Sequence, residues 1–297
     1  MPNHSNFIKP DMKHEYTEAL SDSIMGSIES FEEIHYPIYV LSKNRPKRVT
    51  LKLLDDMKVN YYLVIEPQDY DKYTEVLESE YMSIVVLPEN DRGISYVRNY
   101  CKQHSIKNSH KWHWQIDDNI QNFYIRKDDK NVKHNGRNLL SATEYLSHRF
   151  DNVGIIGLCH KGFAFAKKNN IDINKQVYSC VLVKNALDIN WRDDVVEDTD
   201  YSLQVLSNRQ CTLLLNRMLI DKHTTSTNSG GNDNTDEWRL KRSEGLQKYW
   251  PGAFEITHQY GRVKVKPSRI WRTFRHMPAG SSVDLNENTL ELFFENT

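Results

Sequence analysis

The sequence predicts an α/β fold in which a mostly parallel central sheet carries helices on both faces. Three observations lead to this class. Strand-like and helix-like segments alternate at regular intervals between residues 35 and 117. The strand-like segment 83–88 is short and mostly apolar, as expected of a strand buried on both faces. Polar residues directly follow several strands, and in parallel sheets ligands bind beyond these carboxyl ends.

Composition sets the outer limits on function. The chain has 297 residues and a formal net charge of −1, so no global field attracts nucleic acid or membrane. No apolar run approaches the roughly 18 residues of a membrane span, and no basic start leads into an apolar segment. We therefore expect no membrane partner and no signal peptide. The four scattered cysteines lack a C-x-x-C spacing, which favours buried thiols in a reduced, cytoplasmic protein.

The elements of the first half follow from local patterns. Residues 1–33 are acidic and poor in apolar side chains, which predicts a peripheral arm with helical character after Pro10. Pro46 suits a helix start, and the following apolar residues have helical spacing. The expected strands are 35–42, 61–66, 83–88 and 112–116, and the helices between them begin near Pro46, Tyr70 and Gly93.

After Asn119 the alternation becomes irregular. A polar stretch, 121–135, predicts a hairpin or loop, and 162–174 predicts a loop or irregular insertion. Residues 224–236 are rich in Ser, Thr, Asn and Gly, which is typical of a flexible loop. The expected helices are 139–150, one after Asp200, and 238–249, and the expected strands are 153–158, 178–183 and 211–215.

The stretch Lys111–Asn119 carries the first candidate site. Its alternation of apolar and polar residues predicts a strand, and Asp117 and Asp118 stand at its end. Adjacent carboxylates at a strand end can hold a divalent cation against a phosphate. A turn or a helix cap would use the same residues.

Further candidates lie elsewhere in the chain. Five carboxylates occur from Asp193 to Asp200. Capping of the next helix would use one or two of them, such as Glu197 and Asp198. The alternative is that the cluster binds a cation or takes part in proton transfer. Gly93 permits a close backbone approach to a phosphate or sugar. Arg98 lies about one helical turn further along, where it could contact the same ligand or be an ordinary surface arginine. His223 enters the Gly-rich loop as a possible ligand or a solvated side chain.

Together these motifs resemble the GT-A glycosyltransferases. The acidic pair after the fourth strand, the Gly-x-x-x-x-Arg-Asn helix before it and the downstream Glu-Asp pair occur in the same order. The Gly-Gly-Asn loop and the basic C-terminus are most similar to the TET-associated glycosyltransferases. That group occurs in bacteriophages, includes the kinetoplastid base J glucosyltransferase, and glycosylates hydroxymethylated pyrimidines in DNA.

The resemblance implies a role for each matching residue and a division of the chain. It implies that a sugar is transferred from a nucleotide-diphosphate sugar, such as a UDP-sugar, with the help of Mn²⁺ or Mg²⁺. Inversion of the anomeric centre is expected, and a route through a covalent intermediate stays open. The protein would act in the cytoplasm, that of the host cell if a phage encodes it. The expected parts are an arm (1–33), a catalytic GT-A core (34–232) and an acceptor-binding C-terminal part (233–297). The implied residues are Asp198 and Glu197 for catalysis, Ser42, Arg45, Glu66, Arg98 and Asp117 for the donor, and Asp118 and His223 for the metal.

A basic and aromatic C-terminal segment is the candidate acceptor site. Residues 261–275 hold six Lys or Arg with Trp271 and Phe274 among them. This pattern suits a phosphate backbone and a stacked or flipped base in double-stranded DNA, or a solvated surface that balances acidic segments. The candidates are Arg262, Lys264, Lys266, Arg269, Trp271 and Arg272, with Arg239, Lys241, Arg242 and Lys248 adding to the charge.

Three other functions remain open from the sequence. The same fold could act on a glycan, protein or small acceptor. A nucleotidyltransferase also uses a strand-end acidic pair, although the basic loop Lys43–Arg48 lacks the glycine expected there. A DNA-binding module without activity would gain nothing from two acidic clusters.

Overall fold

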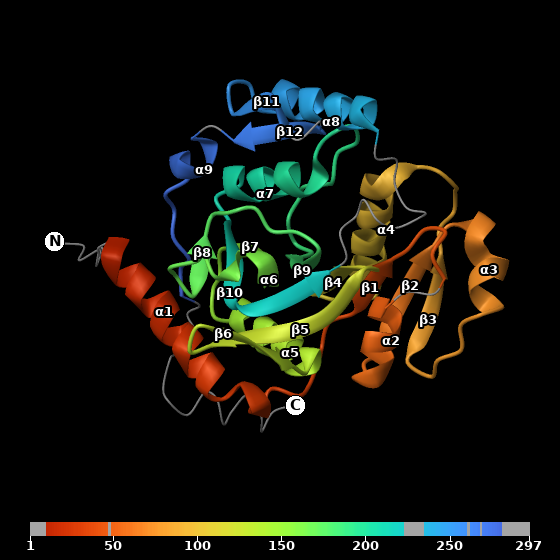
Figure 1. The fold of residues 1–297 in the computed structure, drawn as a ribbon, viewed down its shortest axis with the longest axis horizontal. Helices are drawn as coiled ribbons and strands as arrows, with labels where there is room; N and C mark the ends of the chain where they lie inside the picture. Colours follow the sequence, from red (N-terminus) through yellow and green to blue (C-terminus); the bar gives the residue numbers. More distant parts are fainter. Residues whose placement is uncertain (1–9, 47–48, 223–234, 260–261, 268, 281–297) are drawn as a thin grey trace.

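The computed structural model describes residues 10–46, 49–222, 235–259, 262–267 and 269–280 (Figure 1). A 10-stranded sheet, in the order β3-β2-β1-β4-β9-β7-β10-β5-β6 with β8 on β10, forms its centre, and β11 and β12 pair separately. The strands are β1 (Ile38–Leu41), β2 (Tyr61–Ile65), β3 (Met82–Val86), β4 (Trp112–Asp117), β5 (Ile120–Lys127), β6 (Lys130–His134), β7 (Val153–His160), β8 (Ile171–Ile173), β9 (Cys180–Lys184), β10 (Cys211–Lys222), β11 (Phe254–Gln259) and β12 (Arg262–Pro267). The helices are α1 (Pro10–Gly26), α2 (Val49–Asp56), α3 (Tyr70–Thr74), α4 (Gly93–Lys107), α5 (Gly136–Ser147), α6 (Lys161–Ala164), α7 (Glu197–Ser207), α8 (Asp236–Tyr249) and α9 (Ile270–Thr273).

The predicted α/β class is confirmed, and the first half of the sheet is parallel as expected. Strands β3, β2, β1 and β4 pair in parallel, so their carboxyl ends lie at one edge. Apolar clusters cover both faces: Leu51 and Leu54 of α2 pack on one side, and Cys101 of α4 packs on the other. The strand ends that carry the candidate site are therefore held by packing on two sides.

The second half of the sheet is mixed rather than parallel. β9 runs antiparallel between β4 and β7, and β5 and β6 form the hairpin expected in the polar stretch. Asp118 and Asn119 form the turn between β4 and β5, so they do occupy a turn, and they also face a cavity. Segment 162–174, expected to be a loop, contains α6 and β8.

Polar side chains inside β4 lock α4 against the sheet. Gln115 is fully buried, accepts a hydrogen bond from Arg98 Nη1 at 2.9 Å, and donates one to the Arg98 carbonyl at 3.0 Å. His113 is also buried and bonds Asn185 through Nδ1 at 2.6 Å. Buried polar groups need such partners, and here they fix the position of Arg98 at the site.

Glu144 of α5 joins the starts of β1 and β4 on the opposite edge of the sheet. Its carboxylate accepts the backbone N–H of His35 at 2.7 Å, that of Tyr36 at 3.2 Å and the indole N–H of Trp114 at 2.8 Å. Burial raises the pKa of Glu144 to about 7, although these three donors act against the rise.

The N-terminal segment shares the main core. Ile24, Ile28 and Phe31 are buried in the same apolar cluster as the strands. Four elements, α8, β11, β12 and α9, form a further layer, named here the C-terminal layer, visible beyond α7 in Figure 1. Leu203 and Leu206 of α7 pack against Leu246 of α8 in that layer. The division at residues 34 and 233 stays a prediction.

Gly245 marks a close approach between α8 and the segment before α7. A Cβ at this position would collide with the backbone carbonyl oxygen of Asp194. Only a residue without a side chain lets the helix lie this close.

The state of the cysteines and the character of the described helices agree with what the composition predicts. All four cysteines are buried and unpaired, as predicted. In the parts of the chain that the structure describes, no helix combines the length and apolar character needed to cross a membrane.

Candidate active site

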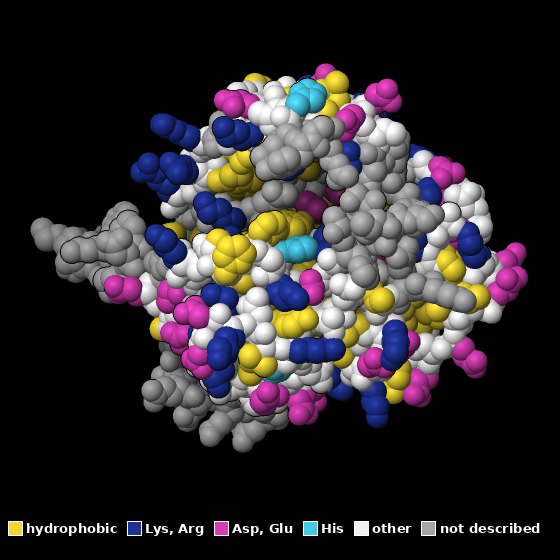
Figure 2. All heavy atoms as spheres, viewed as in Figure 1, with side chains coloured by type: hydrophobic (Ala, Val, Ile, Leu, Met, Phe, Trp, Pro, Cys, Tyr) yellow, Lys and Arg dark blue, Asp and Glu magenta, His cyan; other side chains and the backbone are white. Residues whose placement is uncertain are grey.

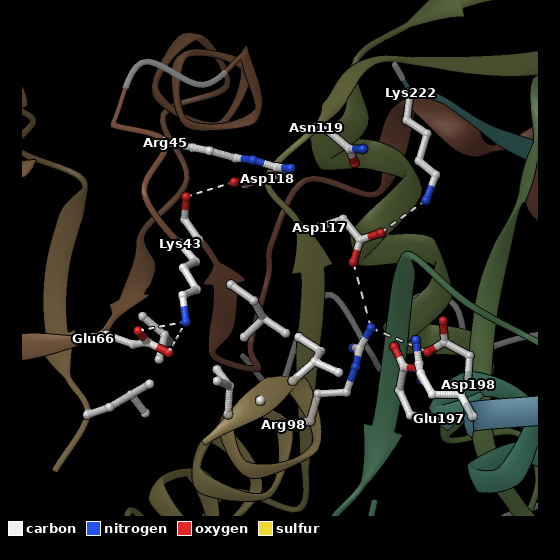
Figure 3. A pocket seen from close by; sticks show the side chains of 18 of the residues that line it. Lys43, Arg45, Glu66, Arg98, Asp117, Asp118, Asn119, Glu197, Asp198 and Lys222 are labelled. Carbon is white, nitrogen blue, oxygen red and sulfur yellow. Dashed lines mark hydrogen bonds and ion pairs between the residues drawn. The ribbon is translucent and has the colours of Figure 1, made fainter. Parts of the chain in front are cut away.

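A cavity of about 260 Å³ opens at the carboxyl ends of β1, β2 and β4 (Figure 3). Its far side is formed by the start of α7, the end of β10 and two residues of α8. Ser42, Arg45, Glu66, Arg98, Asp117, Asp118, Glu197 and Asp198, all chosen from the sequence, line this one cavity. Residues separated by more than 150 positions thus meet where the parallel strands end.

Asp118 is held by the loop after β1. Ser42 Oγ donates to Asp118 Oδ2 at 2.7 Å, and Arg45 Nη1 lies 3.2 Å from Oδ1. Ser42 also bonds the hydroxyl of Tyr73 at 2.7 Å, which ties the loop to α3. The Asp118 side chain is almost completely buried, so its orientation is fixed before any ligand binds.

Asp117 and Asp198 share one arginine. Arg98 Nη2 lies 3.7 Å from Asp117 Oδ1 and 3.3 Å from Asp198 Oδ1, and Lys222 Nζ lies 3.1 Å from Asp117 Oδ2. Burial opposes ionisation of Asp117, but Lys222 and Arg98 outweigh it and lower the pKa of its carboxyl. Figure 3 shows Arg98 pointing up between the two carboxylates.

The environment of Asp198 changes its pKa in the direction opposite to that of Asp117. Burial raises the pKa of Asp198, Arg98 and Lys222 act against that rise, and the charge of Asp117 adds to it. The side chain still keeps 23% of its surface exposed. A carboxylate with a raised pKa that a ligand can reach has the properties of a general base.

Glu197 is engaged by the C-terminal layer. Its carboxylate forms an ion pair with Arg242 of α8, whose Nε also donates to the carbonyl oxygen of Val195. Burial lowers the pKa of Arg242 to about 10. The sequence predicted only that Arg242 adds to the basic charge of the candidate acceptor segment, whereas the close packing of α8 brings it into the cavity lining.

The opposite end of the cavity is apolar with one acidic group. Leu41, Val64 and Leu87 form the wall, and the buried Glu66 pairs with Lys43 at 3.0 Å. Gly93 opens α4 at this wall with a φ of +81°, a conformation that glycine adopts readily. A flat heterocycle fits such a wall, with Glu66 and Lys43 to hydrogen-bond its edge.

Charges in the cavity balance before any ligand enters. Among the described lining residues, the carboxylates are Glu66, Asp117, Asp118, Glu197 and Asp198, and the cations are Lys43, Arg45, Arg98, Lys222 and Arg242. A diphosphate would therefore leave an excess of negative charge in a partly buried site. A divalent cation would offset that excess, and the hard carboxylate oxygens of Asp118 and Asp117 are the ligands it prefers.

The described residues offer fewer than a full set of metal ligands. No group of three or more His, Cys, Asp or Glu is placed to hold an ion within the described ranges. Mg²⁺ and similar ions at nucleotide sites commonly use one or two carboxylates, with phosphate oxygens and water completing the shell. Asp118 and Asp117 fit that pattern. His223 lies outside the described residues.

Most of the expected acceptor residues lie outside the cavity, in the C-terminal layer. Lys264 and Lys266 of β12 are exposed, as are Arg269 and Arg272 around α9, while Trp271 packs partly into the layer. Arg262 begins β12. Figure 2 shows Lys and Arg side chains gathered over α9 and the adjoining part of β12, to one side of the central hollow.

Sequence reasoning missed Lys43, Lys222 and Trp238 as cavity residues. Lys222 ends β10, which continues seven residues beyond the predicted end of that strand at Leu215. The available signal was the polar pair Asp221-Lys222 just before His223, at the end of a long strand. Trp238 could not be found, because nothing local indicates that α8 folds back over the strand ends.

A family model described as TET-Associated Glycosyltransferase matches residues 36–231. No curated protein sequence matches the chain. A crystal structure of GalNAc-T7 with UDP, GalNAc and Mn²⁺ is similar to it at 9% identity and a TM-score of 0.45, covering 77% of this chain and 56% of that one. A 4-diphosphocytidyl-2C-methyl-D-erythritol synthase from Anaerococcus prevotii is similar at 10% identity and a TM-score of 0.35, covering 71% and 98%. The chain thus spans little more than half the length of the first of these proteins.

Proposed function

The chain belongs to the TET-associated glycosyltransferase family and is a glycosyltransferase, and from this premise we propose its substrates and mechanism. It transfers a sugar from a nucleotide-diphosphate sugar, with UDP as the nucleotide, to the hydroxymethyl group of a modified pyrimidine in DNA. The observation that carries the proposal is the single cavity in which Asp117, Asp118 and Asp198 meet around Arg98.

The donor would lie along the cavity. Its base would pack on the apolar wall of Leu41 and Val64 near Glu66, and its diphosphate would lie beside Arg45 and Arg98. A divalent cation, Mn²⁺ or Mg²⁺, would be held by Asp118 with Asp117 and His223 as further candidate ligands. When bound, the ion acts as a Lewis acid on the diphosphate.

Asp198 would remove the proton from the acceptor hydroxyl. As the acceptor oxygen forms its bond to the anomeric carbon, the bond from that carbon to the diphosphate oxygen breaks, and its electron pair leaves with the diphosphate. The proton ends on Asp198, and Arg98 and Lys222 offset the negative charge that develops on the leaving group.

Direct displacement by this route inverts the anomeric centre. A retaining route would need a second carboxylate as nucleophile on the other face of the sugar. Glu197 is the carboxylate next to Asp198 in the sequence. Its ion pair with Arg242 favours a role in holding the site together over a role as the nucleophile. Inversion is therefore the proposed outcome.

The exposed basic residues support DNA as the acceptor. The C-terminal layer contains the exposed residues Lys264, Lys266, Arg269 and Arg272. The same layer contributes Trp238 and Arg242 to the lining of the cavity. Cations at this spacing suit phosphate contacts on a polymer whose modified base enters the site.

The decisive experiment offers the purified protein UDP-sugars and Mn²⁺ with DNA that contains 5-hydroxymethylcytosine or 5-hydroxymethyluracil. Mass spectrometry of the digested nucleosides should show a glycosylated base, and unmodified DNA should stay unchanged. If both modified DNAs stay unchanged while a glycan, peptide or small acceptor is glycosylated, the DNA acceptor is wrong and the glycosyltransferase assignment stands.

A further inference from the structure

Exposed aromatic side chains gather at the corner between β7 and α6, outside the donor cavity. Phe163 is 57% exposed and Phe165 is 74% exposed. His160 packs against Phe163 with ring centroids 5.9 Å apart, and it stacks on Tyr178 at 5.5 Å with 28° between the rings. Scattered exposed apolar residues are ordinary, but here three rings are in contact through His160, and Phe165 adds an exposed ring two residues after Phe163. We name these four residues the aromatic platform.

The platform adjoins the groups proposed to carry out the transfer. Tyr178 precedes Ser179, whose carbonyl accepts the backbone N–H of Asp117 at 2.8 Å and whose Oγ accepts a hydrogen bond from Lys222 at 2.7 Å. His160 pairs in register with Ile220, two residues before Lys222. Figure 2 shows hydrophobic side chains and a histidine over α6, next to the hollow in which acidic side chains are seen.

The electrostatic environment agrees with this position. Burial raises the pKa of Tyr178 to about 12, and the charges of Cys159 and Asp198 add to the rise. Burial lowers the pKa of His160, and the charge of Lys222 lowers it further, while Asp117 and Asp221 act against them. Tyr178 is therefore close enough to Asp198, and His160 is close enough to Asp117 and Lys222, to feel their charges. Within the described residues, none of its four members lines the donor cavity.

One polar atom of the platform has no hydrogen-bond partner in the part of the chain that the structure describes. His160 Nε2 is buried and lacks a hydrogen-bond partner among the described residues. Leaving a buried polar atom unsatisfied is costly unless a ligand or water completes it. Stacked rings with a nearby hydrogen-bonding group match the needs of a flat heterocycle that carries polar atoms on its edge.

We propose that His160, Phe163, Phe165 and Tyr178 hold the acceptor base by stacking, with its hydroxymethyl group directed to Asp198. The assignment rests on the function proposed above and deepens it, because it divides acceptor binding between two surfaces. The basic residues of β12 and α9 bind the phosphate backbone, while the platform binds the base that has left its stack. The four rings are positioning residues, since they touch the substrate away from the reacting atoms.

The test compares variants that keep apolar volume but remove the rings. The double variant Phe163→Leu/Phe165→Leu should raise the KM for hydroxymethylated DNA about tenfold or more, in keeping with base–aromatic stacking. The KM for the UDP-sugar and the melting temperature should stay as in the wild type, because both side chains are exposed. Phe163→Trp should keep the wild-type KM for DNA. Val132→Leu, at an exposed position of β6, serves as the matched control.

The possible outcomes separate the platform from the proposed function. If the wild type glycosylates DNA and the double variant keeps its KM for DNA, the platform assignment is wrong while the function stands. If the wild type modifies no DNA, the proposed acceptor is wrong, and anisotropy with a fluorescently labelled single-stranded oligonucleotide then tests the platform alone. Weaker binding by the double variant would support a base-stacking surface, and equal binding, or no binding by the wild type, would overturn it.

Discussion

At the scale of single residues, the site depends on how one arginine is shared. Arg98 lies between Asp117 and Asp198, and it is almost completely buried because Gln115 fixes it from inside the sheet. The two carboxylates consequently differ: the pKa of Asp117 is lowered and that of Asp198 is raised. Two similar groups with pKa values moved apart can hold different roles, one binding charge and one moving a proton.

The first prediction concerns Asp198. Asp198→Asn should reduce the transfer rate about 10²- to 10⁴-fold and leave UDP affinity unchanged, because the amide cannot accept the proton. The raised pKa means that Asp198 becomes protonated at a higher pH than an ordinary aspartate, so the wild-type rate should fall as the pH drops through that value. The pH profile of kcat measures this. Asp193→Asn, at an exposed position of the same acidic segment, should behave as the wild type, and full activity of Asp198→Asn would remove it as the base.

The second prediction concerns Lys222. Its ammonium group lies 3.1 Å from Asp117 and lines the cavity proposed to hold the diphosphate. Lys222→Met should weaken UDP binding about 10- to 100-fold, the effect expected for a charge-assisted hydrogen bond. Calorimetric titration with UDP measures the affinity, and Lys52→Met, at an exposed lysine that does not line the cavity, is the control. Unchanged affinity would mean that Lys222 serves to hold Asp117 and does not meet the donor.

At the scale of elements, two contacts hold the layers that carry these residues. Glu144 connects α5 to the beginnings of β1 and β4, and Gly245 lets α8 approach the segment before α7. Both lie away from the proposed chemistry, and each can be tested by its effect on stability.

Glu144→Gln should lower the free energy of unfolding by about 1–3 kcal/mol, because the amide cannot accept all three hydrogen bonds. The folded pKa of Glu144, about 7, exceeds the ordinary value of 4.5, so the fold favours the protonated form. Its contribution to stability is therefore complete below pH 4.5 and declines as the pH rises through 7. Urea unfolding across this pH range should show the decline in the wild type and lose it in Glu144→Gln. An unchanged slope would contradict the assignment.

Gly245→Ala should destabilise the protein although alanine favours a helix. In an open helix the change would stabilise by about 1 kcal/mol. Here the new methyl group collides with the Asp194 carbonyl, and overpacking of this kind costs about 1–3 kcal/mol. Thermal unfolding measures the difference. Gly26→Ala, where no atom lies within 4 Å of the added Cβ, should leave the melting temperature the same or higher.

The sequence predicted the elements that local patterns define and the cavity residues at their ends. Strand ends at Ser42, Glu66 and Asp117 were found because alternation and apolar runs mark the parallel strands directly. The antiparallel insertion of β9 and the return of α8 over the site depend on contacts between distant segments, which no local pattern reports. The same limit explains why Arg242 was not predicted as a cavity residue, since its charge alone is typical of an exposed residue.

At the scale of the whole molecule, the balance of charge in the cavity governs ligand binding. Five carboxylates face five cations among the described lining residues, so a diphosphate introduces negative charge that these residues do not offset. UDP with Mn²⁺ should therefore bind more tightly than UDP alone. Saturation about 100-fold above Kd would stabilise the fold by about 2.7 kcal/mol.

Thermal shift measurements can test this metal dependence. The melting temperature of the wild type should rise more with UDP and Mn²⁺ together than with UDP alone in buffer from which EDTA has removed divalent ions. Asp118→Asn should abolish the difference between the two conditions while keeping a smaller shift with UDP. Equal shifts with and without the ion would contradict a metal at Asp118.

The position of α8 over the cavity also has a consequence during protein synthesis. The strand that carries Asp117 and the helix α7 that carries Asp198 are complete once β10 has left the ribosome, but Trp238 and Arg242 emerge later. A nascent chain at that stage has the strand ends in place and leaves Glu197 without its ion-pair partner. The cavity therefore gains its last walls, and Glu197 gains its ion-pair partner, late in translation, when α8 docks on α7.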